Sequence, residues 1–77
     1  MLYNGKHYYK IDVPGIKNGY SFMAVSSDEL DELDVLDLCC RAGYFDDDTD
    51  AGYAEVDDLV SVYDIEHFIK NGCVREI

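Results

Sequence analysis

The sequence predicts an α+β fold: a small antiparallel sheet, built from an N-terminal hairpin and C-terminal strands, covered on one face by one or two helices. Two observations predict it. Short aromatic and β-branched segments bounded by glycine or proline lie toward both ends of the chain, and one acidic amphipathic segment lies between them. Because 77 residues make one domain and 48% of them are hydrophobic, we expect residues 1–77 to form a single acidic, folded domain.

The hairpin is predicted from two strands, 7–13 and 20–25. Between them, Pro14-Gly15 and Asn18-Gly19 are turn signals, and the length of this connection leaves the register open. Alternate residues of a strand share a face. The side chains expected to share one are Tyr9, Ile11 and Val13 in the first strand, and Tyr20, Phe22 and Ala24 in the second, where Met23 and Val25 face the other way.

The acidic segment that follows is predicted to be the main helix. Ser26 with Glu29 three positions later is a capping-box pattern, and Gly43 preceded by Arg41 is typical of a helix C-terminus. The clustered acids of the first turns are favoured there by the helix dipole. The expected apolar side consists of Leu30, Leu33, Leu36 and Cys40, widened by Val35, Leu38 and Cys39.

The C-terminal third has two interpretations. Residues 53–56 and 59–63 favour two short strands, followed by a short helix, 65–70, capped by Asp64 and ended by Asn71-Gly72, and by a final strand, 73–77. The alternative is one longer helix over 57–71. The β-branched Val60, Val62 and Ile65 favour the shorter elements.

The negative charge is concentrated in one block. Of the 17 Asp and Glu residues, 15 lie between Asp28 and Glu66, where Arg41 is the only basic residue, and the formal net charge is −11. A small domain needs a net charge of only about 2 to 8 in magnitude for solubility. Because concentrated charge repels itself, a basic partner or a cation is expected to compensate it. The six Lys and Arg residues form no basic stripe, which argues against direct nucleic-acid binding.

The predicted helix has the charge density of a nucleic acid. Six carboxylates in ten residues place roughly one charge per 2.5 Å of helix axis, compared with about one per 1.7 Å of B-DNA counting both strands. Such a surface could occupy a basic groove that tracks phosphates, although a merely solvated helix face gives the same pattern. Tyr44 and Tyr53 flank the acidic loop and could stack on arginines. The expected partner-binding residues are Asp28, Glu29, Asp31, Glu32, Asp34, Asp37, Asp46, Asp47, Asp48, Asp50, Tyr44 and Tyr53.

The acidic loop only partly matches a calcium-binding loop. Asp46, Asp48 and Asp50 have the spacing of the first three EF-hand ligands, but Ala51 stands where that loop has glycine and Asp57 where it has a bidentate glutamate. The pattern therefore favours weak, non-specific attraction of divalent cations, and we assign no metal or cofactor.

The cysteines and the absence of motifs favour a non-enzymatic intracellular protein. Cys39, Cys40 and Cys73 are an odd number without secretory signals, so we expect small buried hydrophobes rather than disulfides or a redox or metal site. No CxxC, phosphate loop or serine motif is present, and we expect no enzyme. Residues 1–10 lack an apolar leader and no segment approaches about 20 apolar residues, so we expect a cytoplasmic protein with no membrane partner.

The segments SSDELDELDVLDL (26–38) and FDDDTDAGYAEVDD (45–58) carry a resemblance. In general character the chain resembles small acidic anti-defence proteins of phages and mobile elements, such as anti-CRISPR and ArdA-type antirestriction proteins. The resemblance implies DNA mimicry: non-enzymatic inhibition, in a bacterial host cell, of the nucleic-acid-binding site of a CRISPR-Cas effector or restriction enzyme. Two alternatives remain: an interaction module of a host regulatory or toxin–antitoxin system that binds through apolar and tyrosine side chains, and a divalent-cation-binding domain.

Overall fold

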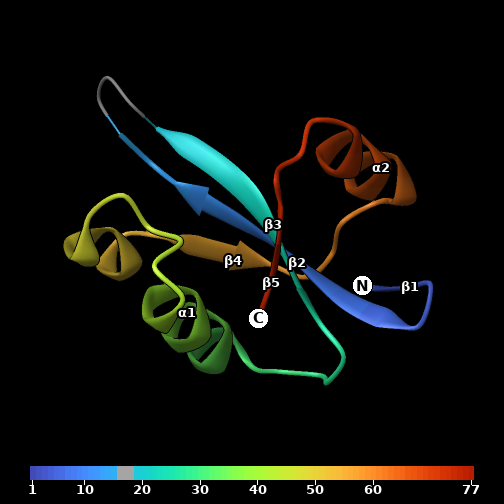
Figure 1. The fold of residues 1–77 in the computed structure, drawn as a ribbon, viewed down its shortest axis with the longest axis horizontal. Helices are drawn as coiled ribbons and strands as arrows, with labels where there is room; N and C mark the ends of the chain where they lie inside the picture. Colours follow the sequence, from blue (N-terminus) through green and yellow to red (C-terminus); the bar gives the residue numbers. More distant parts are fainter. Residues whose placement is uncertain (16–18) are drawn as a thin grey trace.

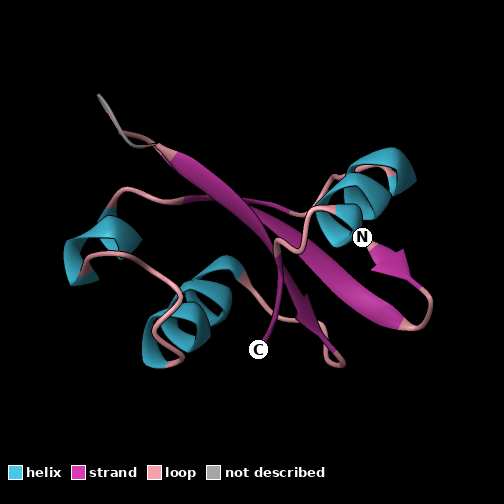
Figure 2. Cartoon of the chain, turned by 45° about the horizontal axis from the view of Figure 1, so that its top comes forward, coloured by secondary structure: helices cyan, strands magenta, loops and turns pink. Residues whose placement is uncertain are grey.

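A mixed sheet with two helices forms the domain, which confirms the α+β class (Figures 1 and 2). The structure, a computed structural model, describes residues 1–15 and 19–77, apart from the side chain of Asp48. Within these residues the strands are β1 (Leu2–Tyr3), β2 (Lys6–Val13), β3 (Tyr20–Ser26), β4 (Glu55–Asp57) and β5 (Val74–Glu76). The helices are α1 (Glu32–Arg41), the short 3₁₀ helix η1 (Asp48–Gly52) and α2 (Val62–Lys70).

The predicted hairpin is confirmed as the centre of the sheet. β2 and β3 pair antiparallel, with Ile11 opposite Phe22 and Tyr9 opposite Ala24. This register places the apolar faces expected for the two strands on the same side of the sheet. The predicted turn residue Asn18 lies outside the described residues.

The sequence predicted a wholly antiparallel sheet, but the sheet is mixed. β1 and β4 pair antiparallel with the same edge of β2, at residues 6–7 and 10–12 respectively, whereas β5 pairs parallel with β3. The chain leaves β4 at one edge, passes through α2 and returns as β5 at the other edge. Because parallel strands cannot be joined by a tight turn, this helical crossover accounts for the direction of β5.

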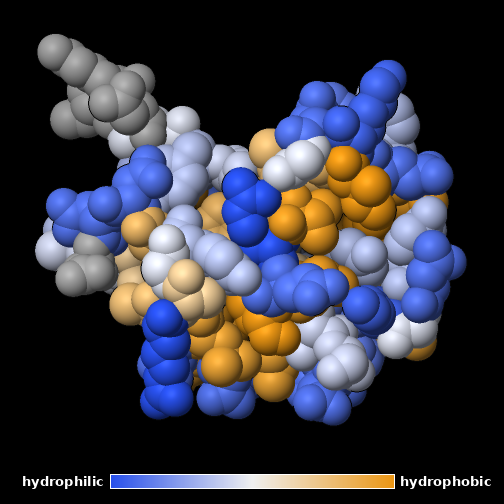
Figure 3. All heavy atoms as spheres, viewed as in Figure 1, coloured by the Kyte–Doolittle hydropathy of each residue, from blue (hydrophilic) through white to orange (hydrophobic). Residues whose placement is uncertain are grey.

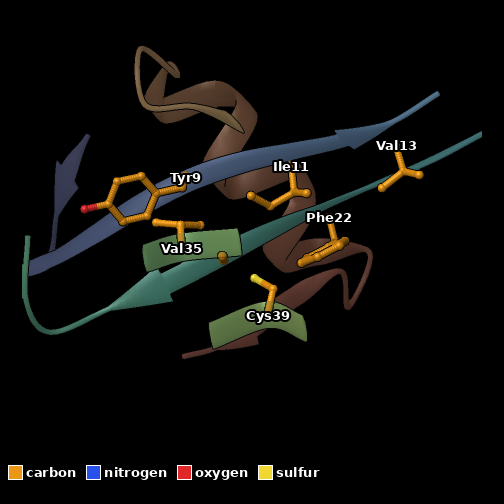
Figure 4. Close-up of a cluster of buried hydrophobic side chains, with 7 residues drawn as sticks. Tyr9, Ile11, Val13, Phe22, Val35 and Cys39 are labelled. Carbon is orange, nitrogen blue, oxygen red and sulfur yellow. The ribbon is translucent and has the colours of Figure 1, made fainter. Parts of the chain in front are cut away.

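The two helices cover opposite faces of the sheet, so the predicted single covered face is wrong. On one face Tyr9, Ile11 and Phe22 pack against Val35 and Cys39 of α1 (Figure 4). The other face has a separate core, in which the strand residues Tyr8, Met23 and Val25 meet Val60 and Ile65. The hairpin has apolar side chains on both faces, and each of these faces needs its own cover.

Helix α1 begins later than predicted and presents a different face. Its N-cap is Asp31, whose side chain accepts a hydrogen bond from the backbone of Asp34 at 2.8 Å. Ser26 is buried at the end of β3, and its hydroxyl accepts from Asp28, so it caps no helix. The inward residues are the fully buried Val35 and Cys39. Leu33 and Cys40, which were predicted to face inward, are exposed, and Leu33 is 77% exposed.

The C-terminal third follows the short-element interpretation only in part. β4 and β5 lie close to two predicted strands, but no strand forms over 59–63. Helix α2 begins earlier than predicted, because Ser61 rather than Asp64 is its N-cap and accepts from the Asp64 backbone at 3.1 Å. The helix ends as predicted at Asn71-Gly72, where Gly72 has a φ of 70°. The single helix over 57–71 is therefore wrong as well.

Candidate acidic interface

The fold places the predicted acidic residues on adjoining elements. Helix α1 contacts both η1 and β4, and Figure 1 shows these three elements together on one side of the molecule. The six carboxylates around α1 are all exposed: Asp28, Glu29 and Asp31 precede the helix, and Glu32, Asp34 and Asp37 lie in it. Acids far apart in the sequence therefore share one surface.

This surface keeps most of its charge. In the described part of the chain, the ion pairs are Lys6–Glu76, Lys10–Asp12 and Arg41–Asp37. Only the last, at 3.1 Å, involves an acid of the 28–58 segment, and both of its side chains are exposed. Because an exposed pair of this kind contributes about 0–1 kcal/mol, it neutralises little of the surface.

At the start of η1, two of the predicted contact acids, Asp47 and Asp50, accept hydrogen bonds that hold this segment in place. The Asp47 carboxylate accepts from the backbone and the hydroxyl of Thr49, both at 2.9 Å, and these bonds lower the pKa of Asp47. Asp50 accepts from the Asp47 backbone at 3.3 Å, which completes a capping box. Asp50 also accepts from the Tyr20 hydroxyl at 2.7 Å. Asp47 and the preceding predicted contact, Asp46, are exposed, whereas Asp50 is half-buried.

Tyr20 ties this loop to the sheet. Its hydroxyl donates to Asp50 and accepts from the Asp46 backbone at 2.9 Å. Burial raises the pKa of the Tyr20 phenol to about 12, the Asp46 N–H works in the opposite direction, and the adjacent Asp50 carboxylate adds to the rise. The phenol therefore stays neutral and keeps its proton for Asp50 well into the alkaline range.

The two predicted contact tyrosines have different environments. Tyr44 is half-buried: its hydroxyl donates to the Glu76 carbonyl at 2.6 Å and its ring packs edge-on against Phe22. Tyr53 follows η1 and is 69% exposed, so its ring is available for stacking. The structure thus gives Tyr44 a packing role and leaves Tyr53 as the accessible aromatic residue of this surface.

A groove that the sequence did not predict joins the two acidic segments. It has a volume of about 300 Å³ and lies between the segment leading into α1 and the chain around β1 and β4, with Glu29 and Asp58 among its lining residues. A second hollow of about 160 Å³ shares Tyr9, Leu30 and Asp58 with it and extends to Asp31 and Glu32. Asp58 was not among the predicted contacts, because only the pairing of β4 with β2 brings it to α1.

Among the described side chains, no group of three or more His, Cys, Asp or Glu residues is placed to hold a metal ion. The Asp48 side chain, one of the three acids in the partial calcium-loop pattern and a predicted contact, lies outside the described part. Asp50, another of the three, is turned toward Tyr20 instead of toward Asp46. The described loop is organised by hydrogen bonds to its own backbone and to the sheet.

The cysteines differ in environment, and all three are free thiols. Cys39 is fully buried beside the sheet, as predicted, and burial, with the neighbouring Cys40, raises its thiol pKa to about 11. Cys40 is exposed and Cys73 half-buried, so the prediction of buried residues is wrong for Cys40. Because adjacent helical residues point about 100° apart, one cysteine of the pair faces the core and the other faces outward.

Neither helix that the structure describes has both the length and the apolar character of a membrane span. No protein-family model matches the chain, and comparisons with curated proteins and with solved structures find no similar protein and no similar fold.

Proposed function

We propose that this protein is a non-enzymatic inhibitor, which uses the acidic surface around α1 to occupy the nucleic-acid-binding site of a basic nuclease complex in a bacterial cytoplasm. A CRISPR-Cas effector or a restriction enzyme is the class of target. The observation that carries the proposal is the group of six exposed carboxylates in and just before α1, of which only Asp37 has a basic partner among the described residues.

The orientation of α1 supports this proposal. Val35 and Cys39 face the sheet, and this leaves Glu32, Asp34 and Asp37 exposed to solvent. Only three of the six carboxylates lie in α1 and the other three precede it, so the helix is less densely charged than the sequence predicted. The carboxylates still have the sign of phosphates, and lysines and arginines that bind phosphate also bind carboxylate. Such binding is expected to be fast through electrostatic steering and to weaken as salt is added.

The alternative, an interaction module that binds through apolar contacts, also has support. Several large apolar side chains are exposed, among them Leu33, Leu59 and Tyr63. Figure 3 shows an apolar area in the middle of the face viewed there, with hydrophilic side chains around it. A complex formed mainly through these side chains would tolerate high salt, whereas a phosphate mimic would not.

The proposal is tested with two double variants that each remove two negative charges from one helix. Glu32→Gln with Asp34→Asn changes α1, and Asp64→Asn with Glu66→Gln changes α2 in the same way. Each variant would be expressed in bacterial strains that carry one restriction or CRISPR-Cas system, and the survival of a targeted plasmid would be measured.

Wild-type protein is expected to relieve interference by at least one system. The α1 variant should lose about tenfold or more in inhibitory potency, since two charge-assisted contacts contribute roughly 1 kcal/mol or more each. The α2 variant should act like wild type. Equal inhibition by both variants, or no relief of any system, would contradict phosphate mimicry.

A further inference from the structure

The groove beside α1 combines an apolar lining with an acidic rim. Leu2, Leu30 and Leu59 line it together with Tyr9, and the exposed acids Glu29 and Asp58 line it as well. Leu59 is 89% exposed and Leu2 61% exposed, so two leucines here meet water. Burying one such side chain in a partner is favourable, which makes this groove a better contact site than a purely charged surface.

The walls of the groove are held in place by hydrogen bonds. The Tyr9 hydroxyl accepts from the Leu30 backbone at 2.8 Å, which fixes the segment before α1 to β2. On the opposite side the Met1 nitrogen donates to the Asp58 carbonyl at 2.8 Å, and Asp57 accepts from the Leu59 backbone at 2.9 Å. Leu59 is therefore presented from a defined turn, and the groove is formed before any partner binds.

The charges around the groove select the kind of partner that fits. The adjoining hollow adds Asp31 and Glu32 to Glu29 and Asp58, so four carboxylates lie along one continuous surface. Lysine and arginine are absent from the described lining of both hollows, where the groups able to carry positive charge are His7 and the Met1 ammonium, which donates to the Tyr8 and Asp58 carbonyls. An acidic rim around leucines complements a segment in which an apolar side chain is flanked by cationic ones.

We propose that this groove anchors a basic segment of the partner protein, in which a leucine-sized aliphatic side chain lies between arginines or lysines. The aliphatic side chain packs against Leu2, Leu30 and Leu59, and the flanking cations meet the four carboxylates. This proposal rests on the proposed function and deepens it, because it gives the acidic surface a contact that salt does not screen. It also gives the surface a means of choosing among basic proteins.

Two acetylated, amidated peptides, Arg-Arg-Leu-Arg-Arg and Arg-Arg-Ser-Arg-Arg, test the anchor. They carry equal charge and differ only in the central side chain. Titration into ¹⁵N-labelled protein, followed by NMR at low and at moderate salt, gives affinities and the residues that are perturbed. The leucine peptide is expected to bind about tenfold more tightly, as burial of one leucine predicts, and to shift the signals of Leu2, Leu30 and Leu59.

Matched variants assign that preference to the groove. Leu59→Ser should bring the two peptides to equal affinity, and its amide spectrum should match wild type away from the groove because this side chain is exposed. Leu33→Ser changes another highly exposed leucine, on α1 and outside the groove lining, and should keep the tenfold preference.

The outcomes separate this proposal from the function on which it rests. Equal binding of both peptides to wild type at low salt would overturn the groove and leave the acidic surface in place. A preference that Leu33→Ser removes and Leu59→Ser leaves intact would also overturn the groove. Failure of both peptides to bind at low salt would overturn the groove and the basic-partner proposal together.

Discussion

The two helices pack on opposite faces of one sheet and are built alike, but their outer surfaces differ. Each has an N-cap side chain, Asp31 or Ser61, that accepts from the backbone three residues later, and each buries at least one residue completely. The polar residues of α2 include both signs, with Asp64 and Glu66 against Lys70, whereas α1 sets three acids against Arg41 alone. The formal charge is −1 for α2 and −2 for α1, and since α2 folds with less acid, the acid of α1 exceeds what a helix on this sheet requires.

The largest effect is expected in the two cores, since each helix buries at least one side chain completely against its own face of the sheet. Ile65 is fully buried on the α2 face, and Ile65→Ala should cost about 2–5 kcal/mol of unfolding free energy because it leaves a cavity. Val35→Ala on the α1 face should cost less, since it removes fewer atoms. Urea denaturation followed by circular dichroism measures both; a loss below about 1 kcal/mol for Ile65→Ala would mean that α2 does not form a second core.

The two N-caps should contribute similarly. Asp31→Ala and Ser61→Ala should each cost about 1 kcal/mol, because each leaves a backbone N–H at the start of its helix without its side-chain partner. Asp31→Asn should be nearly neutral in the same denaturation experiment, since asparagine caps as well as aspartate. If Asp31→Asn costs as much as Asp31→Ala, the charge of Asp31 rather than its cap is what stabilises α1.

A smaller effect should reveal the self-repulsion of the acidic surface. Asp58 shares a hollow with Asp31 and Glu32, so Asp58→Asn should raise the unfolding free energy by about 0.5 kcal/mol at low salt. The gain should shrink as sodium chloride is added, because exposed charges are screened. Glu66→Gln on α2 is the control and should change stability little; an equal gain from it would place the repulsion across the whole molecule.

The last effect appears only at alkaline pH. The raised pKa of Tyr20 means that the unfolded chain loses this proton near its ordinary pKa, 10, while the folded protein holds it to about 12. The contribution of Tyr20 to stability is therefore complete below pH 10 and declines as pH rises toward 12. The difference in phenolate absorbance between wild type and Tyr20→Phe reports this titration. A Tyr20 signal that titrates at its ordinary pKa would contradict the half-buried contact with Asp50.

The sequence predicted those elements whose residues repeat with a clear period, and missed contacts between distant segments. Alternation in the hairpin gave the faces of Ile11 and Phe22 correctly. The capping pattern predicted at Ser26 was wrong, because Ser26 is buried in β3 and Asp31 is the N-cap of α1, which local spacing could not show. The approach of Asp58 to Glu29 depends on strand pairing between β4 and β2, so no local pattern reveals the groove.

The most direct test of the central claim is capture of a target by tagged wild-type protein from nuclease-expressing bacteria, with the two double variants in parallel. Bound proteins would be identified by mass spectrometry after washes at low and high salt and after addition of duplex DNA. The account predicts a basic nuclease complex that is released by salt and by DNA, is lost with the α1 variant and is retained by the α2 variant. A partner that resists salt, ignores DNA and binds both variants equally would contradict it.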